Sequence, residues 1–247
     1  METRQLVAIA ALIVTGLVCV VRIVLKHRRR LHKRFPRVVV LCGAMGAGKT
    51  TAADILCNGT NHMGIIDSWL MPRYREYAMA GPLKEMMKPM GFTDQQLYGT
   101  QADKAKPHKD WGVSMREFAQ KFGTEVMRQT LPRTIPELRL GGRSIWVRIA
   151  EIVIGQWLTS DPDTFVVVSD GRYVDEIGML REKFNAHVVC IERDAATAAA
   201  AQAGGNLHVS EKAWQDGSIK MDVRLPNNST KQSLARNLFK ALMKPNR

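Results

Sequence analysis

The stretch Val38-Val39-Val40-Leu41-Cys42-Gly43-Ala44-Met45-Gly46-Ala47-Gly48-Lys49-Thr50 decides the fold. Its first five residues are apolar and predict a buried strand, and residues 50–56 have helical composition. Between them, residues 43–50 read G-x-x-x-x-G-K-T, the spacing of a phosphate-binding loop. A strand, a glycine-rich turn and a helix in this order favour a nucleoside triphosphate site over an ordinary turn before a helix.

The residue types in this loop suit phosphate chemistry. Glycines let backbone N–H groups close around phosphate oxygens, and the N-terminus of the following helix adds the positive end of its dipole. We expect Lys49 to reach the β- and γ-phosphates and the Thr50 hydroxyl to ligate Mg²⁺. The loop therefore predicts a bound nucleotide with its metal ion, without saying what reaction follows.

Composition indicates one α/β domain with a basic appendage. The chain has 247 residues, of which 45% are hydrophobic, enough for a sizeable core. Its four cysteines show no metal-binding spacing and are typical of a reducing compartment. The net charge is +13, but eight basic residues and no acid lie between Arg22 and Arg37, which leaves +5 for the rest. The high pI therefore describes a local patch.

The N-terminal segment predicts a membrane anchor. Residues 6–21 carry no charge, and three apolar residues after Arg22 extend the run to 20, about the length that a bilayer core needs. Because positive charge stays cytoplasmic, the basic cluster predicts an N-terminus outside and a body inside. We expect a transmembrane helix over residues 1–25, a basic juxtamembrane segment over 26–37 and a cytoplasmic kinase domain over 38–247, in a single-pass membrane protein.

Other interpretations of the N-terminus are weaker. A cleaved signal peptide needs a charged start and a small-residue cleavage site, and the chain has neither. Residues 28–34 also fit a nuclear localisation signal. Specific nucleic-acid binding is not expected, because the cluster lacks interleaved aromatic side chains apart from Phe35.

The body alternates strand-like and helix-like segments. This alternation predicts a parallel sheet with ligands at the carboxyl ends of its strands. Ser114 and Glu117 predict a capping box at one helix start. Residues 98–111 are predicted to form a loop over a site. The predicted strands are 38–42, 74–79, 165–168, 187–191 and 221–225, and the predicted helices are 50–56, 83 onward, 114–127, 144–158, 175–184, 195–203 and 230–243.

Charged residues at the ends of these segments suggest phosphoryl transfer. Asp170 ends an apolar strand, where a Walker-B-type acid would hold the hydration shell of Mg²⁺ or bind the acceptor. Cations at the loop ends would neutralise the transferring group; the candidates are Lys84, Arg116, Arg172 and Arg193. The chain offers no obvious pair of nucleophile and general base. That favours a phosphate monoester as the acceptor, since its oxygen is already an anion.

Four segments in this order give the chain a resemblance to a known family. They are residues 41–56, 77–86 (Tyr-Ala-Met-Ala-Gly-Pro-Leu-Lys-Glu-Met), 111–125 (ending Phe-Ala-Gln-Lys-Phe-Gly-Thr-Glu) and 166–176. Together they resemble the deoxynucleoside monophosphate kinases of bacteriophages and large DNA viruses, over residues 38–243. The resemblance implies a P-loop kinase three-layer sandwich with a central parallel sheet. It also implies ATP, Mg²⁺ and a deoxynucleoside monophosphate as ligands.

The resemblance also implies roles for individual residues. ATP would be bound by the loop and closed over by one lid cation: Gly43, Gly46, Ala47, Gly48, Lys49, Thr50, Thr51 and Arg193. The acceptor would be bound by Lys84, Arg116, Gly123, Thr124, Trp146, Asp170, Arg172 and Glu176, with Trp146 against the base, although a core tryptophan is an equal interpretation. Lys49, Asp170 and Arg172 are the expected catalytic residues, and Thr50 the expected metal ligand.

Three segments depart from the family pattern, and alternatives stay open. The departures are the N-terminal anchor, an apparent insertion over residues 131–142 and an Ala-rich segment after Arg193. Animal-type phosphomevalonate kinase shares Gly-Pro-Leu-Lys-Glu and Val-Ser-Asp-x-Arg, and a non-catalytic, membrane-tethered nucleotide-binding adaptor is another possibility. A homodimer is also possible.

Overall fold

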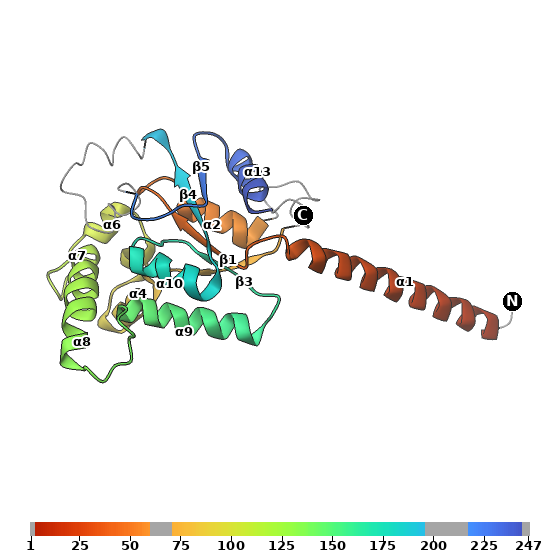
Figure 1. Cartoon of the computed structure of the whole chain (residues 1–247), viewed down its shortest axis with the longest axis horizontal. Helices are drawn as coiled ribbons and strands as arrows, with labels where there is room; N and C mark the ends of the chain where they lie inside the picture. The colour runs from red at the N-terminus through yellow and green to blue at the C-terminus, as the bar shows by residue number, and fades with distance from the viewer. Residues whose placement is uncertain (1–2, 60–70, 196–216, 244–247) are drawn as a thin grey trace.

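A five-stranded parallel sheet forms the centre of the computed structural model, which describes residues 3–59, 71–195 and 217–243. The strand order is β2-β3-β1-β4-β5, and every adjacent pair is parallel (Figure 1). The strands are β1 (Val38–Cys42), β2 (Tyr74–Tyr77), β3 (Phe165–Val168), β4 (His187–Glu192) and β5 (Val223–Pro226). The prediction of an α/β fold with a central parallel sheet is confirmed.

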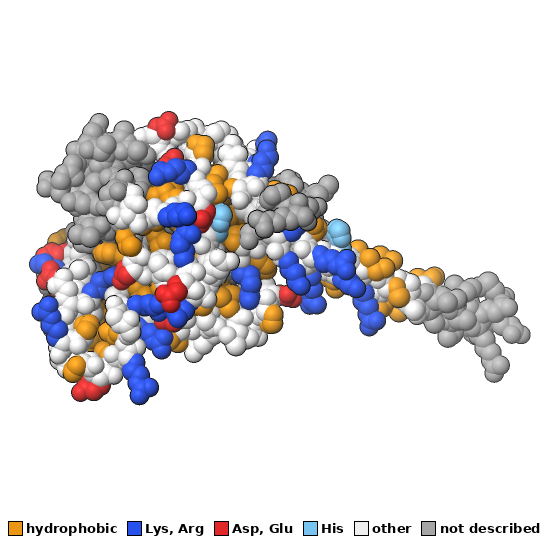
Figure 2. Space-filling view, in the orientation of Figure 1, with side chains coloured by type: hydrophobic (Ala, Val, Ile, Leu, Met, Phe, Trp, Pro, Cys, Tyr) orange, Lys and Arg blue, Asp and Glu red, His pale blue; other side chains and the backbone are white. Residues whose placement is uncertain are grey.

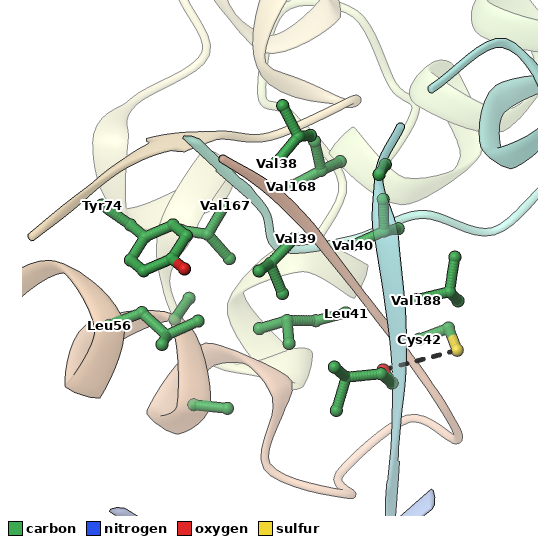
Figure 3. Close-up of a cluster of buried hydrophobic side chains, with 14 of the residues drawn as sticks. Val38, Val39, Val40, Leu41, Cys42, Leu56, Tyr74, Val167, Val168 and Val188 are labelled. Atoms are coloured by element: carbon green, nitrogen blue, oxygen red, sulfur yellow. Dashed lines mark hydrogen bonds between the residues drawn. The ribbon is translucent and has the colours of Figure 1, made fainter. Parts of the chain in front are cut away.

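Helices cover both faces of this sheet, which explains the unbroken apolar strands. In Figure 3, Val39 and Leu41 of β1 point toward Leu56, whereas Val38 and Val40 point to the opposite face. Side chains on both faces are buried, so β1 has no polar alternation. Helices α2 (Lys49–Asn58) and α13 (Lys231–Leu242) contact each other on one side, and α9 (Ile145–Ser160) and α10 (Val174–Phe184) contact each other on the other.

The chain between β2 and β3 folds into a helical region with its own core. Leu83, Met87, Phe92, Leu97, Met115 and Trp146 form this second hydrophobic cluster. The region therefore packs as a second layer of structure beside the sheet. Its helices, besides α9, are α4 (Gly81–Met87), η2 (Lys88–Met90), α5 (Asp94–Tyr98), α6 (Gln101–Ala105), α7 (Met115–Gln120), η3 (Lys121–Thr130) and α8 (Leu131–Thr134).

Local structure differs from the sequence prediction at three places. Residues 98–111, predicted as a loop, contain α6, whose N-terminus is closed by a capping box between Thr100 and Asp103. Ser114 caps α7 as predicted, but the Glu117 side chain bonds Lys121 instead of completing a box. The helix predicted to run to residue 127 changes into a π-helix, η3, at Lys121. The predicted helix over 195–203 lies outside the described residues from 196 on.

The N-terminal helix α1 (Thr3–His32) covers the segment that was predicted as a transmembrane anchor. Within the described part of the chain, no helix combines the length and apolar character needed to cross a bilayer. The uncharged run ends at Arg22 after 16 residues, and α1 then continues through the basic cluster. The predicted membrane tether therefore lacks support. The cytoplasmic location and the homodimer stay predictions.

Helix α1 extends away from the body (Figure 1), and only its C-terminal end is joined to it. Arg29 pairs with Asp163 at 3.3 Å, and the His32 ring lies edge-on to Phe165. Lys and Arg side chains gather on α1 where it meets the body (Figure 2). Apolar side chains further out, such as Ile13 and Leu17, are exposed.

Candidate active site

The phosphate loop connects β1 to α2 as the sequence predicts. Gly43, Gly46 and Gly48 all have positive φ. A side chain at Gly43 would collide with the carbonyl oxygen of Ile191 in β4, so the backbone of the loop packs directly against the backbone of β4. A glycine is required there both for the conformation and for this close approach.

Lys49 and the N-terminus of α2 make this loop a site for anions. The Lys49 ammonium donates to the carbonyl oxygens of Gly43 and Ala44, at 2.7 and 2.8 Å, so it lies over the loop. The N-cap residue Gly48 has no side chain to cap α2, and the N-terminus of a helix favours a bound anion. Thr50 is exposed and Thr51 half-buried at the helix start. The residues predicted to bind ATP and Mg²⁺ therefore lie together, in a conformation that fits phosphate.

Asp170 joins the end of β3 to the start of α4. Its two carboxylate oxygens accept hydrogen bonds from the backbone N–H groups of Met79 and Ala80, at 2.6 and 3.3 Å. These residues come immediately before α4, the helix that carries Lys84. Asp170 thus fixes the position of Lys84 relative to the sheet. Its predicted contact with the metal shell or the acceptor stays a prediction.

Lys84 lies in a concentration of positive charge. Burial lowers the pKa of Lys84, Lys104 and Arg172 lower it further, and Asp170 and Glu76 oppose them. The ammonium nitrogen also lies 4.6 Å from the centre of the Tyr98 ring. Cations that repel each other and share a partly desolvated space are stabilised by a bound anion. The ends of α4 and β3 therefore gather cations, and their binding of an acceptor anion stays a prediction.

Glu176 supports the loop that carries Arg172. It is buried, and one carboxylate oxygen accepts the backbone N–H groups of Arg172 and Tyr173, at 3.0 and 3.1 Å. The other oxygen accepts from the Arg128 guanidinium at 2.5 Å, which also pairs with Asp175 and lies over the Tyr173 ring. Burial raises the pKa of Glu176 to about 7, against the opposing effect of Arg128 and the two N–H groups. This geometry makes Glu176 a support for Arg172, and direct contact with the acceptor stays a prediction.

Gly123, Thr124 and Trp146 belong to the contact between η3 and α9. The indole N–H of Trp146 donates to the carbonyl oxygen of Gly123 at 2.9 Å, and both residues are buried. A Cβ at Gly123 would lie 2.9 Å from a methyl of Leu83, so η3 and α4 pack closely there. Thr124 is half-buried beside them. The structure thus gives Trp146 the packing role that the sequence left open.

Two predicted cations lie apart from this network. Arg116 is exposed and donates to the side chain of Gln101. Arg193 is exposed two residues beyond Ile191, the residue that touches the phosphate loop. Their ligand-binding roles stay predictions.

Three residues that the sequence did not single out belong to the site. The charge of Lys104 lowers the pKa of Lys84, Arg128 pairs with Glu176, and Asn227 donates to the carbonyl oxygen of Ala47 in the phosphate loop. Arg128 follows Thr124 by four residues, a helical spacing that suggests a shared face. The insertion 131–142, with Arg128 and Arg143, lines a cavity of about 510 Å³.

Comparison with known proteins identifies the family. No family model matches the chain. A protein of Acanthamoeba polyphaga mimivirus named "Putative deoxynucleotide monophosphate kinase" is 30% identical over 196 residues, which span 78% of this chain and 89% of the viral protein. The chain belongs to the deoxynucleotide monophosphate kinase family. The family resemblance found in the sequence is thereby confirmed.

Members of the deoxynucleotide monophosphate kinase family are phosphotransferases by name, which agrees with a phosphate loop at the centre of the sheet. A solved structure of an unliganded sugar kinase from Janibacter sp. HTCC2649 covers 84% of this chain and 94% of its own length, with 12% identity and a TM-score of 0.35. A superposition as loose as this supports no inference about fold or function.

Proposed function

We propose that the protein transfers the γ-phosphate of ATP to a deoxynucleoside monophosphate, giving the diphosphate for deoxynucleotide supply. The observation that carries the proposal is that two groups of residues predicted to bind anions follow adjacent strands. The phosphate loop follows β1, the segment with Asp170 and Arg172 follows β3, and these strands are paired. Two anions held at neighbouring strand ends are what a reaction between two phosphates requires.

The residues of the two sites divide the work of phosphoryl transfer. Backbone N–H groups of the loop and Lys49 would hold the donor phosphates, and Thr50 would ligate Mg²⁺, which screens the phosphate charges when bound. Lys84 and Arg172 would hold the acceptor phosphate and neutralise charge as it develops. A monophosphate oxygen is already an anion at neutral pH, so this chemistry needs no general base.

In this proposal the nucleoside of the acceptor would occupy the cavity beside Arg128. The cavity lined by Arg128 and the insertion 131–142 has a volume of about 510 Å³, within the usual range for small-molecule pockets. Arg128 connects it to Glu176 and thereby to Arg172. The name of the mimivirus relative supports a deoxynucleotide as the acceptor.

A panel of acceptors tests the proposal. ADP formation from ATP would be measured with each of the four deoxynucleoside monophosphates and with phosphomevalonate. We expect turnover with at least one deoxynucleotide, and a loss of about 10³-fold in Lys49→Ala, because that change removes charge stabilisation of the transferring phosphate. Turnover of phosphomevalonate alone would assign the protein to the alternative kinase class. ATP binding without turnover of any acceptor would indicate the adaptor.

A further inference from the structure

Asn227, in the turn after β5, connects the end of β4 to the phosphate loop. Its backbone N–H donates to the carbonyl oxygen of Glu192 at the end of β4, at 2.6 Å. Its side-chain amide donates to the carbonyl oxygen of Ala47 at 2.8 Å, 180 residues away in sequence. One residue thus fixes the spacing between the last strands of the sheet and the phosphate loop.

The partner of this amide is a group that the loop itself leaves unsatisfied. A loop that turns its N–H groups toward a phosphate turns carbonyl oxygens away from it, and a buried carbonyl needs a donor. Ala47 is fully buried. Asn227 supplies the donor from outside the loop.

The packing against Gly48 confirms how closely Asn227 approaches. A Cβ at Gly48 would collide with the side-chain nitrogen of Asn227. Gly48 also has a φ of 104°, which disfavours other residues. Asn227 therefore lies against the residue that immediately precedes Lys49.

The next residue reaches a different segment. The side-chain oxygen of Asn228 accepts the backbone N–H of Asp194 at 2.9 Å. Asp194 follows Arg193, the cation predicted to close over ATP. Consecutive asparagines thus tie the phosphate loop and the segment with Arg193 to one turn.

We propose that Asn227 is a positioning residue for the donor nucleotide: it holds Ala47, Gly48 and Lys49 in the phosphate-binding conformation, and Asn228 joins this loop to the segment that carries Arg193. The inference rests on the proposed function, since it assumes that the loop binds ATP. Asn227 acts through the loop backbone and needs no contact with the nucleotide.

The test compares the Michaelis constants of the two substrates. Asn227→Ala leaves the Ala47 carbonyl without its donor, so we expect the KM for ATP to rise about tenfold, the effect of losing one buried hydrogen bond. The KM for the acceptor monophosphate should stay within about twofold, because Asn227 lies on the donor side. A purely structural residue would instead change both constants together with the Tm.

Two further variants keep the test decisive if Asn227→Ala folds poorly. Asn227→Asp preserves the side-chain shape but removes the donor, so it should raise the KM for ATP at least as much. Asn58→Ala is the matched control, because Asn58 lies at the C-terminal end of α2, where its side chain donates to Asp54. Its KM for ATP should equal that of the wild type.

The outcomes separate this inference from the proposed function. Failure of the wild type to use ATP refutes the proposed function, and Asn227 then has no donor nucleotide to position. If the wild type uses ATP and both Asn227 variants keep its KM for ATP, the inference is overturned and the proposed function stands. An equal rise in the KM of both substrates also overturns it.

Discussion

Single residues in this site act largely through the backbone of others. Asp170 holds the amides before α4, Glu176 holds the amides of Arg172 and Tyr173, and Asn227 holds a carbonyl of the phosphate loop. Such residues fix where the cations lie through hydrogen bonds to backbone groups. Their removal should change the geometry of the site more than its charge.

Glu176 should make stability depend on pH near neutrality. Its pKa is about 7 in the folded protein and 4.5 as the ordinary value, so the folded state binds more protons between these pH values. Stability from this group is therefore present at low pH and is lost as pH rises through the window. In Glu176→Gln, the fall in Tm between pH 5 and pH 8 should be smaller than in the wild type by about 5 °C.

Glu182→Gln is the control for this experiment. Glu182 lies on the same helix, but Lys183 and Arg143 hold its pKa below the ordinary value, so it titrates outside the window. Its Tm curve should parallel that of the wild type. Parallel curves for Glu176→Gln and the wild type would contradict the assignment of this titration to Glu176.

The sequence predicted the positions of these residues better than their roles. The phosphate loop was predictable because its glycines and lysine act locally, within one turn of chain. Glu176 was expected to bind the acceptor, whereas the structure shows it buried against backbone N–H groups. This role could not be predicted, because the burial of Glu176 depends on how α10 packs on the sheet and sequence spacing does not reveal that packing. Arg128 could not be paired with Glu176 for the same reason, since the two lie 48 residues apart.

At the scale of elements, the position of α10 depends on the absence of a side chain just before it. A Cβ at Gly171 would lie 2.5 Å from a methyl of Val40, in the central strand, and close to Ile177 of α10. The segment with Asp170 and Arg172 can pass over β1 only because residue 171 is glycine. This close passage brings the end of β3 toward the phosphate loop.

Gly171→Ala should therefore destabilise the protein. Val40 is fully buried and cannot move without disturbing the core, so the free energy of unfolding should fall by about 1–3 kcal/mol. Gly178→Ala is the matched control within α10: nothing lies within 4 Å of its Cβ position, and helix propensity favours alanine by about 1 kcal/mol. Urea denaturation would measure both. Equal stability of Gly171→Ala and the wild type would refute the predicted collision.

Elements buried on both faces were the easiest to predict. The valine runs of β1 and β3 and the apolar run of β4 have no other explanation than a covered parallel sheet. The π-helix η3 was not predictable, because its residues have an ordinary helical composition and its hydrogen-bond pattern is set by packing. Helix α6 was missed because its capping box uses an aspartate in place of the usual glutamate or glutamine.

At the scale of the whole molecule, α1 contacts the body near its own C-terminal end. Arg29 pairs with Asp163 there, and His32 packs against Phe165. Just beyond, Phe35 is buried against Phe239 of α13. The membrane prediction rested on a hydrophobic run counted across Arg22, and the described part of the chain gives it no support.

Deleting residues 1–25 should leave the body intact. We expect a Tm within about 2 °C of the full chain, because the exposed apolar residues of α1 bury no core surface in this structure. Phe35→Ala should by contrast lower the Tm by roughly 10 °C, since removing a buried phenylalanine costs about 3–5 kcal/mol. Thermal unfolding of the three proteins decides. A deletion as damaging as Phe35→Ala would contradict this separation.

The strand order has an evolutionary consequence. Strand β1 lies in the middle of the sheet, with β3 and β2 on one side and β4 and β5 on the other. The helical region lies between β2 and β3 in sequence. The donor side uses the phosphate loop between β1 and α2 and residues after 187. The chain that surrounds the proposed acceptor is residues 78–164 plus the turn after β3. A lineage can therefore replace the helices of that stretch, and with them the preference for one base over another, and still inherit its donor site unchanged.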